Sequence, residues 1–327
     1  MRSRIALALV AVLAACVDAA FGKQPNLRGL PPTLHAVLSN VDIGACPDHN
    51  SGHRRANTAA TTYLKRGELD QALACFVAAL SSKQNFPPAL YGIGETFAKR
   101  TPSGFEMARE SYELSLKHWP EFVDAHIALG DLWADRGDRT RAEMHYESAT
   151  KTRPKDALAW DALARNQMND GRLDQAVETY DTAIDSVVNE VPGLYFSRGR
   201  AQLLREEFEA CANDASHALK RASQFGQAYH LLAACSLKLS GPNAPSTNDV
   251  ETYFRQATQL EPEFADHFLD FARFVYDDDH ARESEARRII EIGLEGDLED
   301  GERAKLEDGL SKFNEFVTST KASRDEL

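Results

Sequence analysis

The residue types most able to do chemistry in this chain are histidine and cysteine, and their spacing matches no catalytic pattern. The ten histidines form no His-x-Asp triplet, no His-Glu-x-x-His motif and no His-Pro-Asp triplet. The chain also has no Cys-x-x-Cys pair and no glycine-rich phosphate loop. His126, His217 and His230 are expected on helices, where a packed or solvated histidine is far commoner than a metal ligand. We therefore expect no enzyme activity, no metal site and no cofactor.

The cysteines could instead stabilise the fold. Cys46 precedes the helical region and Cys75 is expected on a helix, so a disulfide between them would tether a segment with few other anchors. Cys211 stands where the pattern below places a small residue, and it is expected to be a buried small side chain. With Cys235, these residues allow three pairings, so the sequence leaves the pairing open.

The first 22 residues have the features of a signal peptide. Arg2 and Arg4 precede an apolar run from Ile5 to Val17, and small residues follow. The run is too short to cross a bilayer as a helix, which takes about 20 residues. No later segment is long and apolar enough to span a membrane. We therefore expect a translocated chain without a membrane span.

The last four residues resemble the signal that returns proteins to the endoplasmic reticulum. They are Arg324, Asp325, Glu326 and Leu327. Together with the signal peptide, they favour the endoplasmic reticulum lumen. The run from Leu13 to Cys16 instead resembles the lipobox of bacterial lipoproteins, which would place the protein in the periplasm with a lipid on Cys16. We favour the lumen.

Composition limits the class of partner that this chain is expected to bind. The chain has 327 residues, 43% of them apolar, and a net charge of −13. Its length is enough for one large or two ordinary domains. A chain this acidic has no electrostatic footprint for nucleic acid or anionic lipid. Protein partners are therefore expected.

A repeating pattern dominates the middle of the chain. It is clearest over residues 123–156, VDAHIALGDLWADRGDRTRAEMHYESATKTRPKD, and returns in the unit that follows. Small residues at places 8 and 20 of each unit would let two helices approach closely, and glycine at place 15 would allow the turn between them. In this unit, places 7, 8, 11, 15, 20, 24, 27 and 32 hold Leu129, Gly130, Trp133, Gly137, Ala142, Tyr146, Ala149 and Pro154.

The pattern closely resembles the tetratricopeptide repeat. That resemblance implies an all-α solenoid, a right-handed superhelix of helix pairs (A then B) with a concave groove lined by the A helices. About seven units cover residues 53–300, after a signal peptide at 1–22 and an N-terminal extension at 23–52. Residues 301–327 are predicted to form a capping helix and the terminal Arg-Asp-Glu-Leu tail, with a loose stretch from Thr318 to Ser323. The apolar residues expected to face the last repeat are Leu306, Leu310, Phe313, Phe316 and Val317.

Places 5 and 9 of the A helices face the ligand in relatives of this kind. Place 5 is mostly apolar here, whereas place 9 is acidic in early units and basic in later ones, which predicts a polarised groove. A carboxylate clamp is not expected, because Asn57 and Thr61 stand where lysine and asparagine would be needed. The apolar side chains could also simply pack under their neighbours. The candidate groove residues are Asn57, Tyr91, Ile127, Arg165, Phe196, Arg200, Leu269 and Arg273.

These features together resemble the repeat region of the lumenal J-domain co-chaperone, without its J-domain. Our hypothesis is a non-catalytic adaptor or co-chaperone of the endoplasmic reticulum lumen that binds unfolded clients or the lumenal chaperone BiP. One alternative is a bacterial envelope lipoprotein that scaffolds outer-membrane or pilus assembly. Another is a non-catalytic subunit of a lumenal protein-modifying enzyme.

Overall fold

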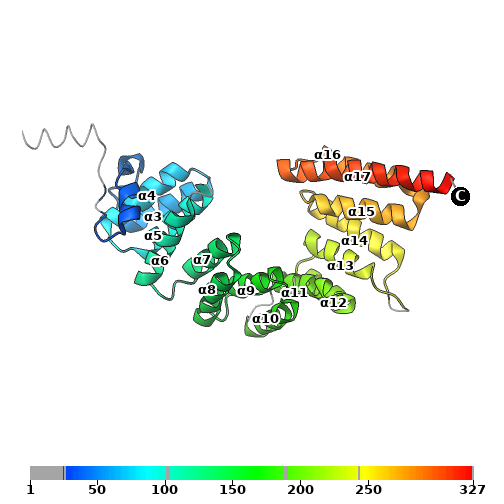
Figure 1. Cartoon of the computed structure of the whole chain (residues 1–327), viewed down its shortest axis with the longest axis horizontal. Helices are drawn as coiled ribbons and strands as arrows, with labels where there is room; N and C mark the ends of the chain where they lie inside the picture. Colours follow the sequence, from blue (N-terminus) through cyan, green and yellow to red (C-terminus); the bar gives the residue numbers. More distant parts are fainter. Residues whose placement is uncertain (1–24, 26, 101–103, 188–190, 242–243, 326–327) are drawn as a thin grey trace, which may run out of the picture. The chain divides into compact units, whose positions relative to one another are not determined.

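The chain is helical throughout its described part. The computed structural model describes residues 25, 27–100, 104–187, 191–241 and 244–325, and every regular element among them is a helix (Figure 1). The all-α class is therefore confirmed. The chain divides into two compact units, residues 1–166 and 167–327, with the division inside one helix, and each unit is described by itself. Residues 1–22 and Cys16, on which the targeting predictions rest, lie outside the described residues.

The first unit begins with two short elements and continues with helix pairs. In each pair the A helix packs against its own B helix and the B helix packs against the next A helix, as in α3, α4 and α5. The elements are α2 (Pro32–Leu38), the 3₁₀ helix η1 (Ile43–Ala45), α3 (His53–Lys65), α4 (Leu69–Ser82), α5 (Pro87–Arg100), α6 (Phe105–His118), α7 (Val123–Asp135), α8 (Arg139–Thr152) and the start of α9 (Ala157–Asn169).

The second unit continues the same alternation and ends with a longer helix. Its elements are α10 (Leu173–Ser186), α11 (Pro192–Leu204), α12 (Phe208–Arg221), α13 (Gly226–Ser236), α14 (Thr247–Leu260), α15 (Ala265–Asp278), the 3₁₀ helix η3 (His280–Arg282), α16 (Glu283–Glu295) and α17 (Asp300–Asp325). Across both units, the A helices begin at residues 53, 87, 123, 157, 192, 226 and 265. The predicted array begins at residue 53 and its clearest unit at residue 123, and both are starts of A helices.

Small residues let the paired helices approach closely, as the pattern predicts. A Cβ atom on Gly94 would lie 2.4 Å from the ring of Tyr112, and one on Gly130 would lie 2.5 Å from the ring of Tyr146. Ala142, at place 20, is fully buried. Contacts under 3 Å are not tolerated, so a larger side chain at place 8 would push the two helices apart.

In four repeats the turn between the A and B helices has a left-handed residue at place 15. Gly67, Gly137 and Gly171 have φ angles of 76°, 79° and 76°. Glu206 holds the same place in its repeat, with φ 62°. A non-glycine residue in this conformation is strained. The turn geometry is thus kept even where the sequence lacks its usual glycine.

The N-terminal extension covers the outer face of α4. Residues 72–80 of α4 are buried without interruption, so this helix is apolar on all sides. Leu34, Leu38 and Ile43 belong to the same hydrophobic core cluster as α4, and η1 packs against that helix. A disulfide joins Cys46 to Cys75. The segment predicted to have few anchors is therefore fastened by both apolar packing and a covalent bond.

A second disulfide joins Cys211 on α12 to Cys235 on α13. Cys211 is fully buried, as expected for a small side chain at its place. The sequence did not indicate its bond to Cys235, because adjacent helices bring the two sulfurs together only in the packed array.

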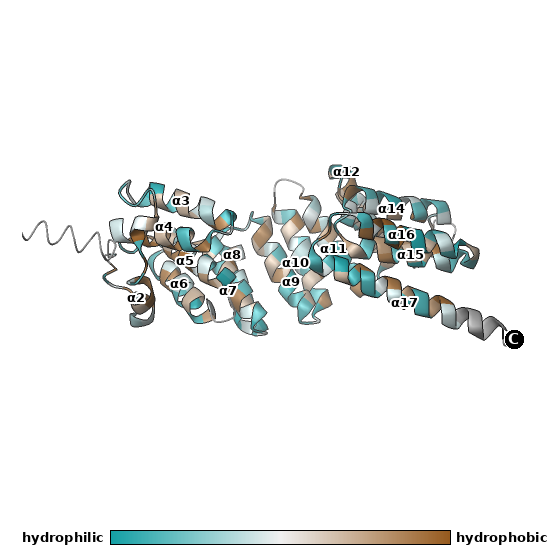
Figure 2. Cartoon of the chain, turned by 90° about the horizontal axis from the view of Figure 1, so that it is seen from above, coloured by the Kyte–Doolittle hydropathy of each residue, from teal (hydrophilic) through white to brown (hydrophobic). Residues whose placement is uncertain are grey.

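The last helix caps the second unit, and that prediction is confirmed. Helix α17 packs against both α15 and α16, with Leu306 and Val317 buried. In Figure 2, α17 carries both hydrophilic and hydrophobic residues along its length. The predicted loose tail is wrong, because α17 continues to Asp325. No proline or glycine interrupts residues 310–325, so the helix has no local reason to end. Arg324 and Asp325 of the predicted retention signal lie on this helix, whereas Glu326 and Leu327 lie outside the described residues.

Within the described ranges, no helix combines the length and the apolar character that a membrane crossing needs.

Candidate functional site

The first unit contains a pocket between successive A helices, α3 and α5, which we call the N-terminal pocket. Its volume is about 410 Å³, within the size range of ligand-binding clefts. Two residues predicted for the groove, Asn57 and Tyr91, lie in it together. The lining comprises Asn57, Thr61, Leu64, Lys65, Phe76, Pro88, Tyr91, Gly92, Glu95 and Lys99.

The apolar part of this pocket is built by close packing. A Cβ atom on Gly92 would lie 2.2 Å from the ring of Phe76, so glycine lets that ring reach the pocket wall. Tyr91 is half-buried, and its ring centroid lies 5.3 Å from that of Phe122 and 5.8 Å from that of Tyr112. Tyr91 therefore packs against the core on one side and lines the pocket on the other.

Three polar side chains of the pocket have unused bonding capacity. The Oδ1 atom of Asn57 is buried and accepts no hydrogen bond from any described residue. A buried oxygen without a donor costs free energy, about 1–3 kcal/mol, which a ligand N–H group could recover. Lys65 and Lys99 are exposed, and the described residues form no ion pair with either ammonium group. The pocket thus offers an acceptor and two cations.

Glu95, also in the lining, is already engaged. The hydroxyl of Tyr112 donates a hydrogen bond of 2.7 Å to its Oε1 atom. In the next repeat the hydroxyl of Tyr146 donates to Asp131 at 2.6 Å. Burial raises the pKa of both tyrosines, and the nearby carboxylates raise it further. Within residues 1–166, the two acids at place 9, Glu95 and Asp131, therefore each accept a hydrogen bond from the tyrosine of their own repeat.

The polarised groove stays a prediction. Its early place-9 acids are Glu95 and Asp131, and each accepts a tyrosine hydrogen bond that leaves its negative charge in place. The N-terminal pocket therefore has both signs of charge, with the Glu95 carboxylate beside the cations Lys65 and Lys99. Both lysines occupy place 13 of successive repeats, so the repeat register itself brings them to one pocket.

A second pocket lies in the other unit between α15 and α17, and we call it the C-terminal pocket. Its volume is about 380 Å³. Both cations in its lining form ion pairs. The Nε atom of Arg273 lies 3.7 Å from Oδ2 of Asp277, and the Nζ atom of Lys312 lies 2.7 Å from Oδ2 of Asp308. The predicted groove residues Leu269 and Arg273 lie in it. The lining comprises Leu269, Asp270, Arg273, Tyr276, Asp277, Ile290, Gly309, Lys312, Phe313 and Phe316. Phe313 and Phe316 were predicted only as capping residues.

The other four predicted groove residues line neither pocket. Ile127 is partly buried against the core cluster that contains Ala142. Phe196 packs on Phe225, with ring centroids 4.9 Å apart, and the Arg200 guanidinium lies 5.9 Å from the Phe196 ring centroid. The Nε atom of Arg165 lies 3.9 Å from Oδ2 of Asp161. For Ile127 and Phe196, the alternative of simple packing describes the structure better than a ligand contact.

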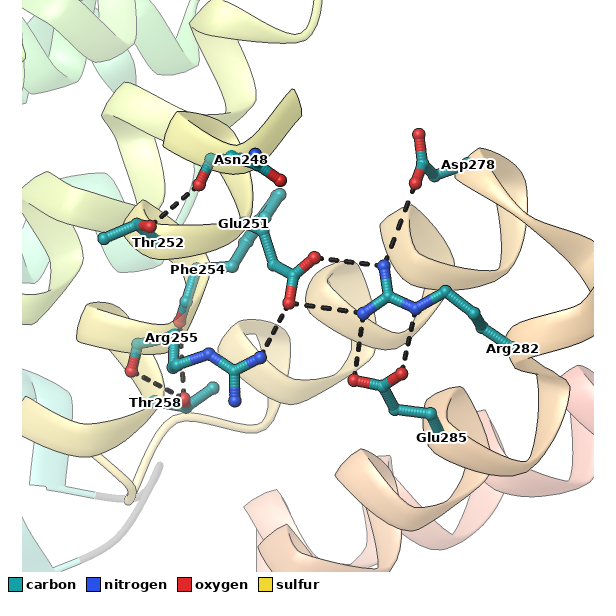
Figure 3. Close-up of polar contacts among 9 residues, drawn as sticks. All are labelled: Asn248, Glu251, Thr252, Phe254, Arg255, Thr258, Asp278, Arg282 and Glu285. Atoms are coloured by element: carbon teal, nitrogen blue, oxygen red, sulfur yellow. Dashed lines mark hydrogen bonds and ion pairs between the residues drawn. The ribbon is translucent and has the colours of Figure 1, made fainter. Parts of the chain in front are cut away.

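The densest charge cluster in the second unit is structural. Arg282 donates hydrogen bonds to both oxygens of Glu251, at 3.0 and 3.2 Å, and to both oxygens of Glu285, at 2.9 Å each (Figure 3). These bonds, chiefly those from Arg282, lower the pKa of Glu251. The cluster joins α14 to η3 and α16, and the Arg282 guanidinium forms ion pairs with both carboxylates. Among the described residues, no group of three or more histidine, cysteine or acidic side chains could hold a metal ion.

Comparison with known proteins shows the fold. Residues 103–160 match the sequence profile of the tetratricopeptide repeat. A search of curated protein sequences gives no significant match. A tetratricopeptide repeat protein from Parabacteroides merdae has 11% identity and a TM-score of 0.57, covering 79% of this chain and 98% of its own.

Two other solved structures are similar. The C-terminal part of a repeat-containing protein from Cytophaga hutchinsonii has 14% identity and a TM-score of 0.54, covering 78% of this chain and 99% of its own. A chain of the APC/C hetero-tetramer Cut9–Hcn1 has 14% identity and a TM-score of 0.50, covering 70% of this chain and 43% of its own. The chain thus contains a tetratricopeptide repeat over residues 103–160 and has the fold of tetratricopeptide-repeat structures.

Proposed function

We propose that this protein is a non-catalytic adaptor that binds an extended segment of another protein in the N-terminal pocket. The observation that supports this most directly is the half-buried Tyr91 beside the unsatisfied Oδ1 atom of Asn57. Extended segments offer free backbone N–H groups and apolar side chains, which match these two features. Repeat arrays are well suited to such ligands because stacked helices form continuous surfaces. The similar Cut9–Hcn1 structure is itself a complex of two proteins.

We further propose that it works in the endoplasmic reticulum lumen as a co-chaperone. The signal-peptide pattern and the terminal Arg324-Asp325-Glu326-Leu327 support that location. Two disulfides agree with an oxidising compartment. Its ligands there would be partly folded clients or BiP. The lipobox-like run ending at Cys16 supports the competing periplasmic location.

The binding proposal is tested with matched aromatic substitutions. Tyr91→Ala and Phe196→Ala each remove a half-buried ring that packs on a phenylalanine before the next A helix, but only Tyr91 lines a pocket. We expect Tyr91→Ala to abolish protection of a denatured model client in a light-scattering assay. Phe196→Ala should keep it. Circular dichroism would check that both variants fold, and full protection by folded Tyr91→Ala would contradict the proposal.

The location is tested at the chain end. Deleting residues 324–327 should raise the amount of protein secreted into the medium relative to the cell lysate. Unchanged secretion would contradict lumenal retention, and palmitate labelling that depends on Cys16 in a bacterium would favour the periplasmic alternative.

A further inference from the structure

We infer that α10 and α11 open locally under native conditions while α13 to α17 stay folded, and that the disulfide between Cys211 and Cys235 keeps α12 on the folded side. The three helices α10, α11 and α12 are called the polar segment here. Such opening is a property of the second unit and does not depend on the ligand of the N-terminal pocket. It follows from the different cores of the polar segment and of the helices after it.

The polar segment buries few large apolar side chains. Those that are buried are Tyr180 and Leu194, and its other buried residues are alanine, glycine, cysteine or polar. Helices α13 to α17 instead contribute to one apolar cluster, which includes Phe254, Phe271 and Ile290. Burial of apolar area is the dominant stabilising contribution in folding. Because each repeat contacts only its neighbours, the polar segment cannot draw this stability from distant helices.

An ion-pair network takes the place of apolar packing in the polar segment. Arg198 on α11 donates hydrogen bonds of 2.8 and 2.6 Å to the buried Asp214 on α12, and a third to Asp181 on α10. Removing charges from water costs free energy that offsets much of their attraction, so the network adds little net stability. When the helices separate, water hydrates these groups again and little apolar surface is exposed.

Gln202 on α11 further favours the open state. It holds place 11 of its repeat, where Phe97 and Trp133 stand in the first unit. Gln202 is 8% exposed, and its Oε1 atom accepts no hydrogen bond from any described residue. A buried acceptor without a donor costs free energy, which is recovered when water reaches it. The apolar rings at place 11 of the first unit carry no such cost.

The second disulfide lies at the border between the two kinds of core. Cys211 on α12 and Cys235 on α13 belong to a small apolar cluster with Leu231 and Leu232 of α13. The covalent bond holds α12 against α13 when α10 and α11 separate from it. Opening of the oxidised chain therefore includes α10 and α11, and it extends to α12 only when the bond is absent.

Hydrogen exchange of the full oxidised chain, measured by mass spectrometry well below the unfolding transition, tests this directly. After correction for intrinsic rates, amides in the middle of α10 and α11 should exchange about tenfold faster or more than those of α15 and α16. In the wild type α12 should exchange with α13. In Cys211→Ser with Cys235→Ser it should exchange with α10 and α11. Cys46→Ser with Cys75→Ser removes the other disulfide and should leave α12 unchanged.

Substitutions at Gln202 decide whether the polar core is the cause. Gln202→Leu replaces the unsatisfied amide with an apolar side chain of similar size, so exchange of α10 and α11 should slow by about five- to hundredfold. Gln259→Leu makes the same change at an exposed position of α14 and should not alter it. Equal wild-type exchange in α10, α11, α15 and α16 would overturn local opening, whatever the variants do. Unchanged exchange in folded Gln202→Leu would overturn its polar cause, and α12 that still follows α13 without the disulfide would overturn the role of that bond.

Discussion

The hydroxyl of Tyr146 lies 2.6 Å from Oδ1 of Asp131, and this bond ties a B helix to its own A helix. Tyr112 and Glu95 make the same connection one repeat earlier, at 2.7 Å. Tyr146 is buried, and burial raises the pKa of Asp131, while the tyrosine bond and Arg165 act in the opposite direction. Asp131 itself is exposed, so the bond fastens the two helices to each other and satisfies the hydroxyl of the buried tyrosine.

Tyr146→Phe should lower the free energy of unfolding by about 0.5–1.5 kcal/mol, the usual net value of a hydrogen bond, because the Asp131 carboxylate is exposed and water can replace the donor. Asp131→Asn in the same background should cost little more, because the acceptor has already lost this donor. A double-mutant cycle measured by urea denaturation gives the coupling. Additive losses from the two substitutions would show that the bond contributes no coupling energy.

Much of this architecture follows from the sequence, because tetratricopeptide-like packing is local. The start of each A helix, the close approach at Gly130 and the turn at Gly137 depend on residues within one repeat, so the spacing alone predicts them. The same local logic explains why the capping helix could be predicted from its apolar residues.

The features that were missed depend on the folded surroundings. Nothing in the spacing shows that Lys65 and Lys99 lack partners, or that Glu95 is bound by a tyrosine, because those facts depend on which side chains meet across helices. The pairing of Cys211 with Cys235 likewise exists only once α12 and α13 pack. The polar composition after Thr318 predicts a loose tail, but α17 continues to Asp325 because helix formers need no apolar face to extend an existing helix.

A buried histidine should make the second unit sensitive to mild acid. His267 is 2% exposed and its Nδ1 atom lies 3.1 Å from the carbonyl oxygen of Glu261. Burial, and then the neighbouring His230, lower its pKa from 6.5 to about 4. The neutral form is therefore favoured in the folded state. Stability from this residue is complete above the unfolded pKa and is lost as pH falls from 6.5 towards 4.

At pH 5 this effect should cost about 2 kcal/mol relative to pH 8, from the difference in pKa between the unfolded and folded states. His267→Asn keeps a donor near the Glu261 carbonyl but cannot be protonated, so its unfolding free energy should fall less over this range. Chemical denaturation at several pH values measures both slopes. Parallel curves for the two proteins would exclude His267 as the titrating group.

The turn at Glu206 offers a stabilising substitution. Its φ of 62° is the left-handed conformation that glycine adopts at the same place in three other repeats. Glu206→Gly removes strain of about 1–2 kcal/mol, while the added freedom of glycine in the unfolded chain takes back about 0.5–1 kcal/mol. We expect a net gain of roughly 0.5 kcal/mol, seen as a higher midpoint in urea.

The reverse change supplies the control. A Cβ atom on Gly137 would meet no atom within 4 Å, so Gly137→Glu tests the backbone conformation without a steric clash. It should lower stability by a comparable amount. If both substitutions shift the midpoint in the same direction, the φ angle is not the cause.

The disulfide between Cys46 and Cys75 should hold the N-terminal extension over α4. The cysteines are 29 residues apart, and closing a loop of that length in the unfolded chain stabilises the fold by about 3–4 kcal/mol. Cys46→Ser with Cys75→Ser should therefore lower the melting temperature. Because residues 72–80 of α4 are apolar on all sides, the loosened extension should also expose hydrophobic surface. Increased binding of a hydrophobic dye below the melting transition would measure this.

The other disulfide distinguishes exposure of α4 from a general loss of stability. Cys211 and Cys235 are 24 residues apart, so their loop-closure contribution is similar, but they join α12 to α13, which pack on each other along their lengths. Cys211→Ser with Cys235→Ser should lower the melting temperature without early dye binding. Limited proteolysis should then cut within residues 27–52 of the first double variant and spare that segment in the second. Equal protection of the segment in both would mean that apolar packing of Leu34 and Leu38 holds the extension without the covalent bond.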